Sequence, residues 1–375
     1  MCYTAVVFKP NYRISAKTIR KLLQIEELKT AVENLPITPS LLKSLRKTAL
    51  LNSTHYSTQI EGNLLTLPEV AAVKAGKRIP ERDRDESEVR NHFAAFAFME
   101  KLAKAKQTIR ESDIKYIHGL VMTGKMKSSA YRAQQNVIRE STSGRIVYLP
   151  PESKDVAKLM HELVQWINLQ LDDGDMPVPI IAAIAHYQFA TVHPYMDGNG
   201  RTARLLATLI LRGHGYGLKG IYSLDEHYAK DLRSYYRALS VGTHNYYDGR
   251  AEADVSQFVN YFCTGVEDAF RKVSLAAARD AKEQVKTVST SVLRDLDPRL
   301  RRLLPLFESQ GNASVIDMAK HLKMRPRTLN DLVPKWVKEG FLEIQNPSRK
   351  ARSYRLSKAI LGKLWRSLRL GPIQE

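Results

Sequence analysis

A polar segment of twelve residues, from His193 to Arg204, lies between two apolar runs at residues 180–192 and 205–211. Apolar runs of this kind are expected to be buried, so the segment between them must turn the chain at a protein core. It contains a histidine, one carboxylate, two glycines in a Gly-Asn-Gly sequence and two arginines. Such a composition does not suit a mere connection. It predicts a site that holds phosphate groups and activates a hydroxyl.

The glycines and arginines of this segment are spaced as an anion site requires. Gly198 and Gly200 allow positive φ and a close approach of the backbone to a ligand. Residues 202–212 are expected to form a helix, so the N–H groups of the turn would face an anion at its positive end. Arg201 and Arg204, three residues apart, lie on neighbouring positions of its first turn. Their guanidinium groups are expected to bind different phosphates of one nucleotide.

Two further residues of the segment suit catalysis. Asp197 is its only carboxylate, and its expected role is to bind a hard cation such as Mg²⁺ that bridges phosphate oxygens. His193 precedes a proline that stiffens the turn, and a neutral imidazole is the usual proton acceptor near pH 7. Taken singly, each of these features is common in ordinary turns and solvated faces. Their ordered combination favours a functional site.

Residues 193–204, HPYMDGNGRTAR, resemble the signature of the Fic family, His-Pro-Phe-x-(Asp/Glu)-Gly-Asn-(Gly/Lys)-Arg-x-x-Arg. Tyr195 stands where Phe is usual, which keeps the ring and adds a hydroxyl that needs a partner or water. The resemblance implies transfer of AMP from ATP to a Ser, Thr or Tyr hydroxyl of a target protein or of the chain itself. Family members that act as kinases carry Lys at the position of Gly200, so glycine favours nucleotidyl transfer.

The resemblance also implies a role for each matching residue. His193 would be the base that deprotonates the target hydroxyl, and Asp197 would hold Mg²⁺. Arg204 would bind the γ-phosphate, while Asn199 and the loop amides would contact the α-phosphate. The full set of implied ATP-binding residues is Gly198, Asn199, Gly200, Arg201, Arg204, Tyr235 and Tyr236. The two tyrosines lie where relatives place aromatic contacts to adenine, but a tyrosine pair in a helix is also common core packing.

A second match lies far upstream. Residues 57–63, STQIEGN, fit the family's inhibitory motif, (Ser/Thr)-x-x-x-Glu-(Gly/Asn), beginning at Ser57. Glu61 would then pair with Arg204 at the γ-phosphate subsite and compete with ATP for it. Shelter from solvent strengthens such an ion pair, although desolvation offsets part of the gain. Without the first motif, Glu61 would more often be a surface residue at the end of a helix.

Residues 136–148 contain two short β-prone runs around a Ser-Thr-Ser-Gly turn, which predicts a hairpin. The hairpin resembles the family's flap, which presents the segment of a target protein to the base by strand addition. An ordinary surface hairpin would have the same sequence pattern.

Most of the remaining chain has helical periodicity, which predicts an all-α fold with one small hairpin. Fic domains are all-α in this way, and the resemblance extends over residues 50–265. We expect an N-terminal helical region with the inhibitory helix (1–110), a Fic core (111–275), a linker or helical extension (276–297) and a C-terminal domain (298–375). The expected helices span residues 16–33, 39–54, 67–77, 87–106, 111–119, 153–172, 178–192, 202–212, 224–239 and 254–281.

Residues 298–375 are strongly basic, because 17 Lys and Arg minus 6 Asp and Glu give +11 of the chain's formal +19. Three helices (298–308, 314–322 and 325–339) followed by strands at 341–344 and 353–356 predict a winged helix-turn-helix domain. Basic residues of its third helix and wing suit phosphate contacts on duplex DNA. Against this, Pro334 would kink the recognition helix, and such modules also dock proteins. The residues meant are Arg325, Arg327, Lys335, Lys338, Arg349, Lys350 and Arg352.

Cysteine content and hydropathy indicate the expected cellular compartment of the protein. Two cysteines, Cys2 and Cys263, make no disulfide framework, and no apolar run reaches the length of a membrane span. We expect a cytoplasmic protein, and the family resemblance implies a homodimer. Two functions remain in view. One is a protein adenylyltransferase that uses ATP and Mg²⁺ and is restrained by Glu61. The other is a DNA-binding regulator whose Fic domain is vestigial or senses a nucleotide.

Overall fold

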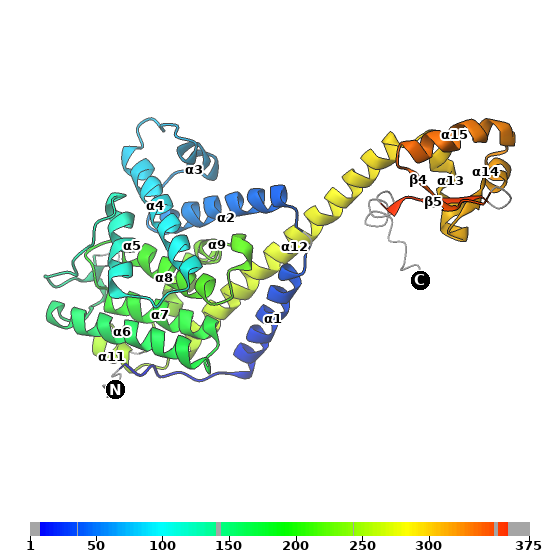
Figure 1. Cartoon of the computed structure of the whole chain (residues 1–375). Coiled ribbons are helices and arrows are strands. Elements are labelled where there is room, and N and C mark those ends of the chain that lie inside the picture. Colours follow the sequence, from blue (N-terminus) through cyan, green and yellow to red (C-terminus); the bar gives the residue numbers. More distant parts are fainter. Residues whose placement is uncertain (1–7, 36, 140–143, 243, 349–351, 359–375) are drawn as a thin grey trace. The chain divides into compact units, whose positions relative to one another are not determined.

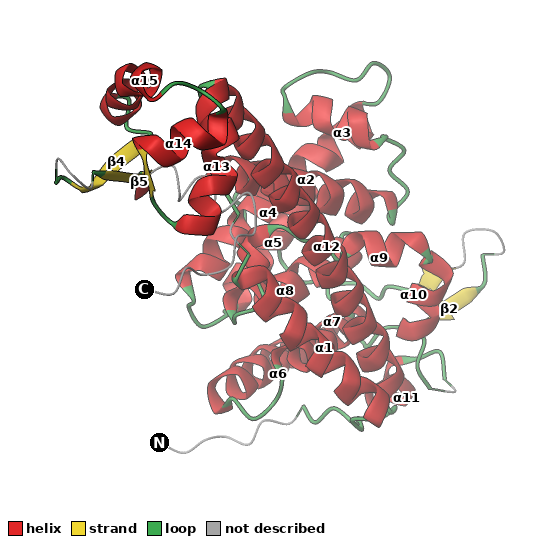
Figure 2. Cartoon of the chain, turned by 90° about the vertical axis from the view of Figure 1, so that its right-hand side faces the viewer, coloured by secondary structure: helices red, strands yellow, loops and turns green. Residues whose placement is uncertain are grey.

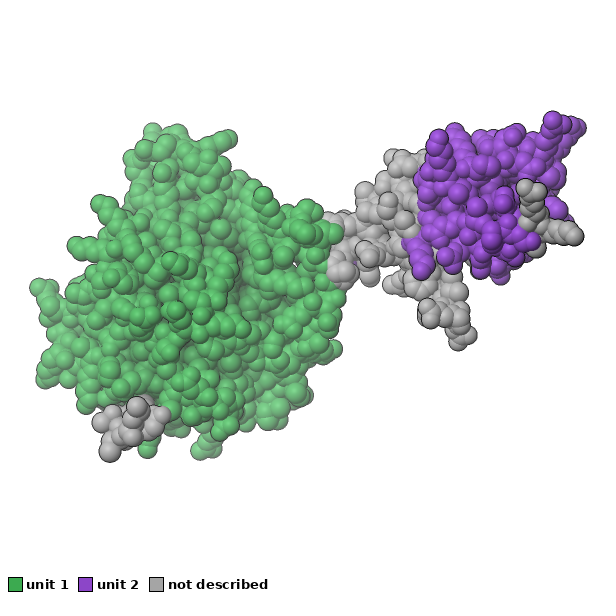
Figure 3. Space-filling view, viewed as in Figure 1, with its two compact units in different colours: residues 1–277 green, residues 278–375 purple. Residues whose placement is uncertain are grey.

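The computed structural model describes residues 8–35, 37–139, 144–242, 244–348 and 352–358 (Figure 1). The chain divides into two compact units, residues 1–277 and 278–375 (Figure 3). The boundary falls within helix α12 (Ser256–Asp295). The segment 276–297, expected as a linker or helical extension, is therefore helical as far as Asp295.

In its described residues, unit 1 is helical apart from one hairpin. Its central helices are α7 (Val178–Val192) and α8 (Asn199–Gly213), which pack along each other. The other elements are α1 (Ala16–Glu33), α2 (Pro39–Gln59), α3 (Leu67–Lys74), α4 (Asp83–Ala105), α5 (Glu111–Thr123), β1 (Ile138–Arg139), β2 (Ile146–Tyr148), α6 (Ser153–Asp173), the short 3₁₀ helix η1 (Leu218–Gly220), α9 (Asp225–Lys230), α10 (Leu232–Leu239), α11 (Tyr247–Ala251) and the first part of α12.

The core forms around α7 because this helix carries no charged residue and is buried on every side. Helices α6 and α11 pack against α7, while α4 and α5 pack against α8 (Figure 1). Each fully buried Ile, Leu or Phe side chain contributes about 1.5–3 kcal/mol, so the α7–α8 pair is the most strongly held part of the unit. The loop that joins the two helices is consequently fixed at both ends.

Several helices differ from the expectation in ways that affect the site. Helix α2 continues to Gln59 instead of ending at 54, so Ser57 lies inside the helix. Helix α8 begins at Asn199, three residues early, because Gly198 adopts a left-handed conformation (φ 75°) and starts the helix. The single helix expected at 224–239 is wrong: Asp231 interrupts it, and its carboxylate accepts a hydrogen bond from Ser234 N at 2.9 Å, which caps α10.

The predicted hairpin is present as an antiparallel pair of β1 and β2, with Ile138 opposite Tyr148. Residues 140–143, which include part of its turn, lie outside the described residues. The Tyr148 hydroxyl donates to the carbonyl of Thr191 at 2.7 Å, near the end of α7. The end of β2 is thereby attached to the helix that leads into the polar loop.

Unit 2 contains α13 (Pro298–Gln310), β3 (Ala313–Ser314), α14 (Val315–Leu322), α15 (Pro326–Lys338), β4 (Leu342–Asn346) and β5 (Ser353–Leu356) (Figure 2). The strands form an antiparallel sheet in the order β3-β5-β4. Its own core includes the fully buried Trp336 on α15, and this helix continues past Pro334 to Lys338. Arg349 and Lys350, expected in the wing, lie outside the described residues.

Candidate functional site

The loop between α7 and α8 is shaped by its two ends and by one side chain. His193 ends α7 in a left-handed conformation (φ 51°), and Gly198 begins α8. The side-chain amide of the buried Asn199 binds both backbone groups of Tyr195, in the middle of the loop. Its Oδ1 accepts from Tyr195 N at 3.0 Å and its Nδ2 donates to Tyr195 O at 2.8 Å. Asn199, expected at the α-phosphate, thus uses its side chain here to hold the loop.

His193 is held as a neutral imidazole. Its Nδ1 lies 3.3 Å from the carbonyl of Ala190, which only accepts, so Nδ1 carries the proton and Nε2 keeps its lone pair. Burial is the main cause that lowers the pKa of His193 to about 4, and Arg132 adds to it. The Nε2 atom is therefore available as a proton acceptor at neutral pH.

Arg132 connects the loop to the segment that follows the hairpin. Its Nε donates to the carbonyl of His193 at 3.0 Å, and its backbone N–H donates to that of Pro194 at 2.9 Å. On the other side, its Nη2 donates to the carbonyl of Pro151 at 2.5 Å. The sequence analysis did not single out this buried arginine, because no local pattern shows which carbonyl groups it reaches.

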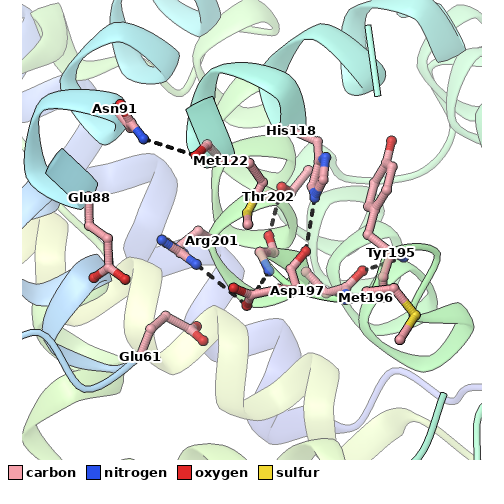
Figure 4. Close-up of polar contacts among 12 residues, drawn as sticks. Glu61, Glu88, Asn91, His118, Met122, Tyr195, Met196, Asp197, Arg201 and Thr202 are labelled. Carbon is pink, nitrogen blue, oxygen red and sulfur yellow. Dashed lines mark hydrogen bonds and ion pairs between the residues drawn. The ribbon is translucent and has the colours of Figure 1, made fainter. Parts of the chain in front are cut away.

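Arg201 and Asp197 form an ion pair at 3.5 Å (Figure 4). The Arg201 side chain is 4% exposed, and its Nε is among the buried atoms for which the described residues provide no hydrogen-bond partner. The Asp197 side chain is 67% exposed and accepts from Gly198 N at 2.6 Å. The exposed Asp197 carboxylate has capacity for a cation.

Arg204 lies deeper and is surrounded by acceptors. Its Nη2 donates to Glu61 Oε1 at 2.9 Å and to the Ser57 carbonyl at 2.8 Å, while its Nε donates to Ser57 Oγ at 3.0 Å. A second carboxylate, Asp225, lies 3.4 Å from Nε. Burial alone would lower the pKa of Arg204, but Glu61 and the other neighbours raise it above its ordinary value. The predicted pairing of Glu61 with Arg204 is thus present as a contact.

Gly200 lies against this pair. A Cβ at position 200 would overlap Glu61 Oε1 and would lie 3.0 Å from Arg204 Nη1. Because glycine has no Cβ, the Glu61 carboxylate can lie directly over the first turn of α8. The absence of a side chain at Gly200 therefore makes room for whatever binds Arg204 from this side.

His118, another residue that the sequence analysis missed, supports the loop from α5. Its ring stacks on Tyr195 with centroids 3.5 Å apart, and its Nε2 donates to the carbonyl of Asp197 at 2.9 Å (Figure 4). The hydroxyl of Tyr195 is buried and has no partner among the described residues. The ring at position 195 thus packs as the more usual phenylalanine would, and its extra hydroxyl remains unpaired.

The two tyrosines expected at adenine differ in environment. Tyr235 is 2% exposed, and its hydroxyl bonds to Nε2 of His186 at 2.9 Å within an aromatic part of the core. Tyr236 is 48% exposed. Of the pair, only Tyr236 offers ring surface to a ligand in this state, and Tyr235 fits the alternative of core packing.

Beside the hairpin lies a groove of about 920 Å³. It is lined by the segment after β2, including Leu149 and Pro151, by the first turns of α6 and by Tyr246. Leu149 and Tyr246 are 40% and 43% exposed. Through Pro151 and Arg132, the floor of the groove is connected by hydrogen bonds to the backbone of His193.

The described residues contain neither a metal site formed by the protein alone nor a membrane-spanning helix. Within the described ranges, His, Cys, Asp and Glu form no cluster of three or more that could hold a metal ion by themselves. A cation at Asp197 would consequently depend on phosphate oxygens and water for its other ligands. Across the same ranges, every helix is too short or too polar to cross a bilayer.

The helical fold and its His-Gly-Asn-Gly-Arg loop define a Fic-type domain. Residues 108–211 match the model of the Fic/DOC family. A Fic family protein from Desulfovibrio desulfuricans G20 has a similar structure (TM-score 0.58, 26% identity, 94% of this chain and 99% of that one). A Fic domain containing signaling protein from Bacteroides thetaiotaomicron shares the fold at 23% identity (TM-score 0.60, 69% of this chain and 97% of that one).

Curated relatives include the protein adenylyltransferase Fic of Drosophila virilis, 26% identical over 309 residues (79% of this chain, 58% of the relative). Protein adenylyltransferase fic-1 of Caenorhabditis elegans is 29% identical over 270 residues (68% and 50%), and that of Caenorhabditis briggsae is 31% identical over 214 residues (56% and 40%). The chain thus spans about half the length of these relatives.

Proposed function

We propose that this protein is an adenylyltransferase that transfers AMP from ATP to a Ser, Thr or Tyr hydroxyl of a target protein or of itself. The observation that carries the proposal is the arrangement around one loop of a neutral base, His193, and two buried guanidinium groups, Arg201 and Arg204. A proton acceptor beside a site for several phosphates is what nucleotidyl transfer requires. The adenylyltransferase names of the relatives support the same reaction.

In this reaction His193 accepts the proton of the target hydroxyl through Nε2, while its Nδ1 proton stays on the Ala190 carbonyl. The hydroxyl oxygen attacks the α-phosphorus, a new P–O bond forms, and the bond to the β-phosphate oxygen breaks to release pyrophosphate. Arg132 holds the backbone of His193 and thereby fixes the position of the base.

The triphosphate is bound by the start of α8. Arg201 binds phosphate oxygens, and Arg204 binds the γ-phosphate in place of Glu61. The backbone amides at Asn199 and Gly200 face the α-phosphate from the helix N-terminus, while that of Gly198 donates to Asp197 and shapes the turn. Asp197 would hold Mg²⁺, which when bound would neutralise charge on the phosphates. Tyr236, with Tyr235 behind it, contacts the adenine ring.

Glu61 restrains this activity. Its carboxylate bonds to the Nη2 of Arg204 and lies over Gly200, where the γ-phosphate would bind. ATP that binds while Glu61 is in place cannot pair its γ-phosphate with Arg204 and is held in an unproductive orientation. Restraint is relieved when Glu61 withdraws.

The target protein binds along the hairpin at residues 136–148, where an extended segment can pair with a strand edge. The adjoining groove offers room for target residues next to the modified hydroxyl. The reaction fits a cytoplasmic setting, since Cys263 is a buried free thiol in the described chain. A homodimer is the assembly that we expect.

The reaction can be tested with the Glu61→Gly variant and two forms of labelled ATP. Label at the α-phosphate should remain covalently bound to protein, whereas label at the γ-phosphate should not. Intact-mass measurement should show the addition of one AMP per modified hydroxyl. His193→Ala in the same background is the matched control. Retention of γ-label instead would indicate phosphoryl transfer and would overturn the proposal.

A second function is favoured by the organisation of unit 2. Unit 2 has three helices and an antiparallel sheet in the order β3-β5-β4, which supports the prediction of a winged helix, and the last of these helices, α15, carries Arg327, Lys335 and Lys338. We propose that residues 298–375 bind duplex DNA through α15, with docking of a protein as the alternative. In that setting the enzyme would act close to DNA, or a vestigial Fic domain would sense a nucleotide for a regulator.

A further inference from the structure

Arg204 has two carboxylate partners, and they differ in accessibility. The side chain of Glu61 is 25% exposed, whereas that of Asp225, at the start of α9, is 5% exposed. Glu61 can leave for solvent with little cost, but Asp225 cannot. Glu61 is therefore suited to be a partner of Arg204 that can withdraw, and Asp225 is suited to be a partner that remains in place.

The two carboxylates also lie at different nitrogen atoms of that group. Glu61 accepts from Nη2 at 2.9 Å, while Asp225 lies 3.4 Å from Nε. Ser57 lies between them, because its Oγ accepts from Nε and its carbonyl accepts from Nη2. Withdrawal of Glu61 would free one of the two N–H groups of Nη2 and leave Ser57 and Asp225 in place.

Asp225 is itself fixed by α2. Its Oδ2 accepts from the Ser53 hydroxyl at 2.5 Å, and the Ser57 hydroxyl, which accepts from Arg204, donates to the same carboxylate. Ser53 and Ser57 are four residues apart and so lie on one face of the helix. Burial raises the pKa of Asp225, while Arg204 and the two serine hydroxyls oppose this shift.

We propose that Asp225 is a positioning residue that keeps Arg204 directed at the triphosphate after Glu61 has withdrawn. The inference rests on the proposed adenylyl transfer and on the proposed role of Arg204 at the γ-phosphate. A buried guanidinium group that has lost every carboxylate partner is strongly unfavourable. With Asp225 in place, the exchange of Glu61 for a phosphate leaves Arg204 compensated at each stage.

The first test measures stability. Glu61→Gly and Asp225→Asn each leave Arg204 one carboxylate, so each should lower Tm modestly, and the double variant should lose more than the sum of the two losses. Saturating Mg-ATP should raise Tm of the double variant more than that of the wild type, since phosphate replaces the missing charge. The matched control is Glu100→Gln. It removes a carboxylate that lies 2.7 Å from Arg212, another arginine of α8. Its effect should be additive with Glu61→Gly.

The second test measures kinetics in the activated Glu61→Gly background. Asp225→Asn should lower kcat/KM for ATP roughly tenfold or more, with both a higher KM and a lower kcat, because a misplaced Arg204 no longer orients the phosphates. Glu100→Gln should change neither constant. Ser53→Ala removes one hydrogen bond to Asp225 but keeps the charges of Asp225 and Arg204. It should raise KM for ATP by a smaller factor, and it replaces Asp225→Asn in this test if that variant does not fold.

The outcomes separate this inference from the proposed function. Additive Tm losses, together with an unchanged KM for ATP in the Asp225→Asn or Ser53→Ala variants, would overturn the role of Asp225. Absence of AMP transfer by Glu61→Gly would overturn the proposed function instead. In that case the Tm coupling and the Mg-ATP shift, which need no turnover, still decide whether Asp225 and Glu61 share Arg204.

Discussion

Glu61 and Arg204 are 143 positions apart in the chain, yet a hydrogen bond of 2.9 Å joins the carboxylate of the first to the Nη2 of the second. The bond lies over Gly200, where any side chain would collide with Glu61. The sequence motif at residues 57–63 and Arg204 are thus parts of one site.

Glu61→Gly should activate the protein. Removal of the carboxylate frees Nη2 of Arg204 for the γ-phosphate, so kcat for self-labelling should rise roughly ten- to a hundredfold, equivalent to about 1.4–2.8 kcal/mol. The measurement is initial rate with α-labelled ATP at fixed Mg²⁺. Adding Arg204→Ala should erase the gain. Equal rates for wild type and Glu61→Gly would contradict the inhibitory role.

His193→Ala should abolish transfer without abolishing ATP binding. The lost base contributes about 10²–10⁴-fold to the rate, whereas the phosphate-binding arginines remain. Labelling rate and calorimetric ATP affinity should be measured side by side in the Glu61→Gly background. Activity within tenfold of the parent would show that another group accepts the proton.

The acid limb of kcat/KM should lie unusually low on the pH scale. Burial lowers the pKa of His193 to about 4, so the base stays unprotonated well below the ordinary histidine range, and activity should fall only as pH approaches 4. The Glu61→Gly variant provides the rate for this profile. A loss of half the activity near pH 6.5 would show that His193 is more solvated than the structure indicates.

Stability should fall below pH 6.5 because buried histidines resist protonation. Burial, with help from Arg204, lowers the pKa of His92 and of His186 to about 3. Their stabilising contribution is complete above 6.5. Between 6.5 and 3 the unfolded chain binds protons that the folded chain does not, and each histidine removes about 1.4 kcal/mol per pH unit.

Denaturant unfolding at several pH values measures this dependence. His92→Gln should reduce the slope of unfolding free energy against pH by the contribution of one histidine. His244→Gln, at an exposed position, should leave this slope unchanged. A slope that is the same in both variants would show that His92 does not remain neutral in the folded chain.

Deletion of residues 298–375 should remove any affinity for duplex DNA and spare self-labelling. Counterion release makes binding by a segment of net charge +11 fall steeply as salt rises. Gel retardation at several salt concentrations measures it, with alanine at Arg325, Arg327, Lys335 and Lys338 as a milder variant. If the full chain retards no duplex at low salt, residues 298–375 dock a protein instead.

Much of the fold and of the loop could be predicted because the information is local. Apolar runs on both sides of residues 193–204 determine two buried helices, and the contiguous loop brings His193 next to Arg201 and Arg204 without any knowledge of the tertiary fold. The break at Asp231 could not be predicted in the same way. Periodicity across residues 224–239 favours one helix, and a single capping carboxylate decides for two.

The sequence by itself determined the class of fold and named the residues to which we assign the chemistry, since both depend on spacing along the chain. Only the tertiary structure decided which groups complete the site. Arg132 at the His193 carbonyl, His118 against Tyr195 and Asp225 beside Arg204 all come from elements distant in the chain. Residues that meet through packing leave no periodic signal, because a buried polar group needs a partner of suitable chemistry but no fixed spacing in sequence.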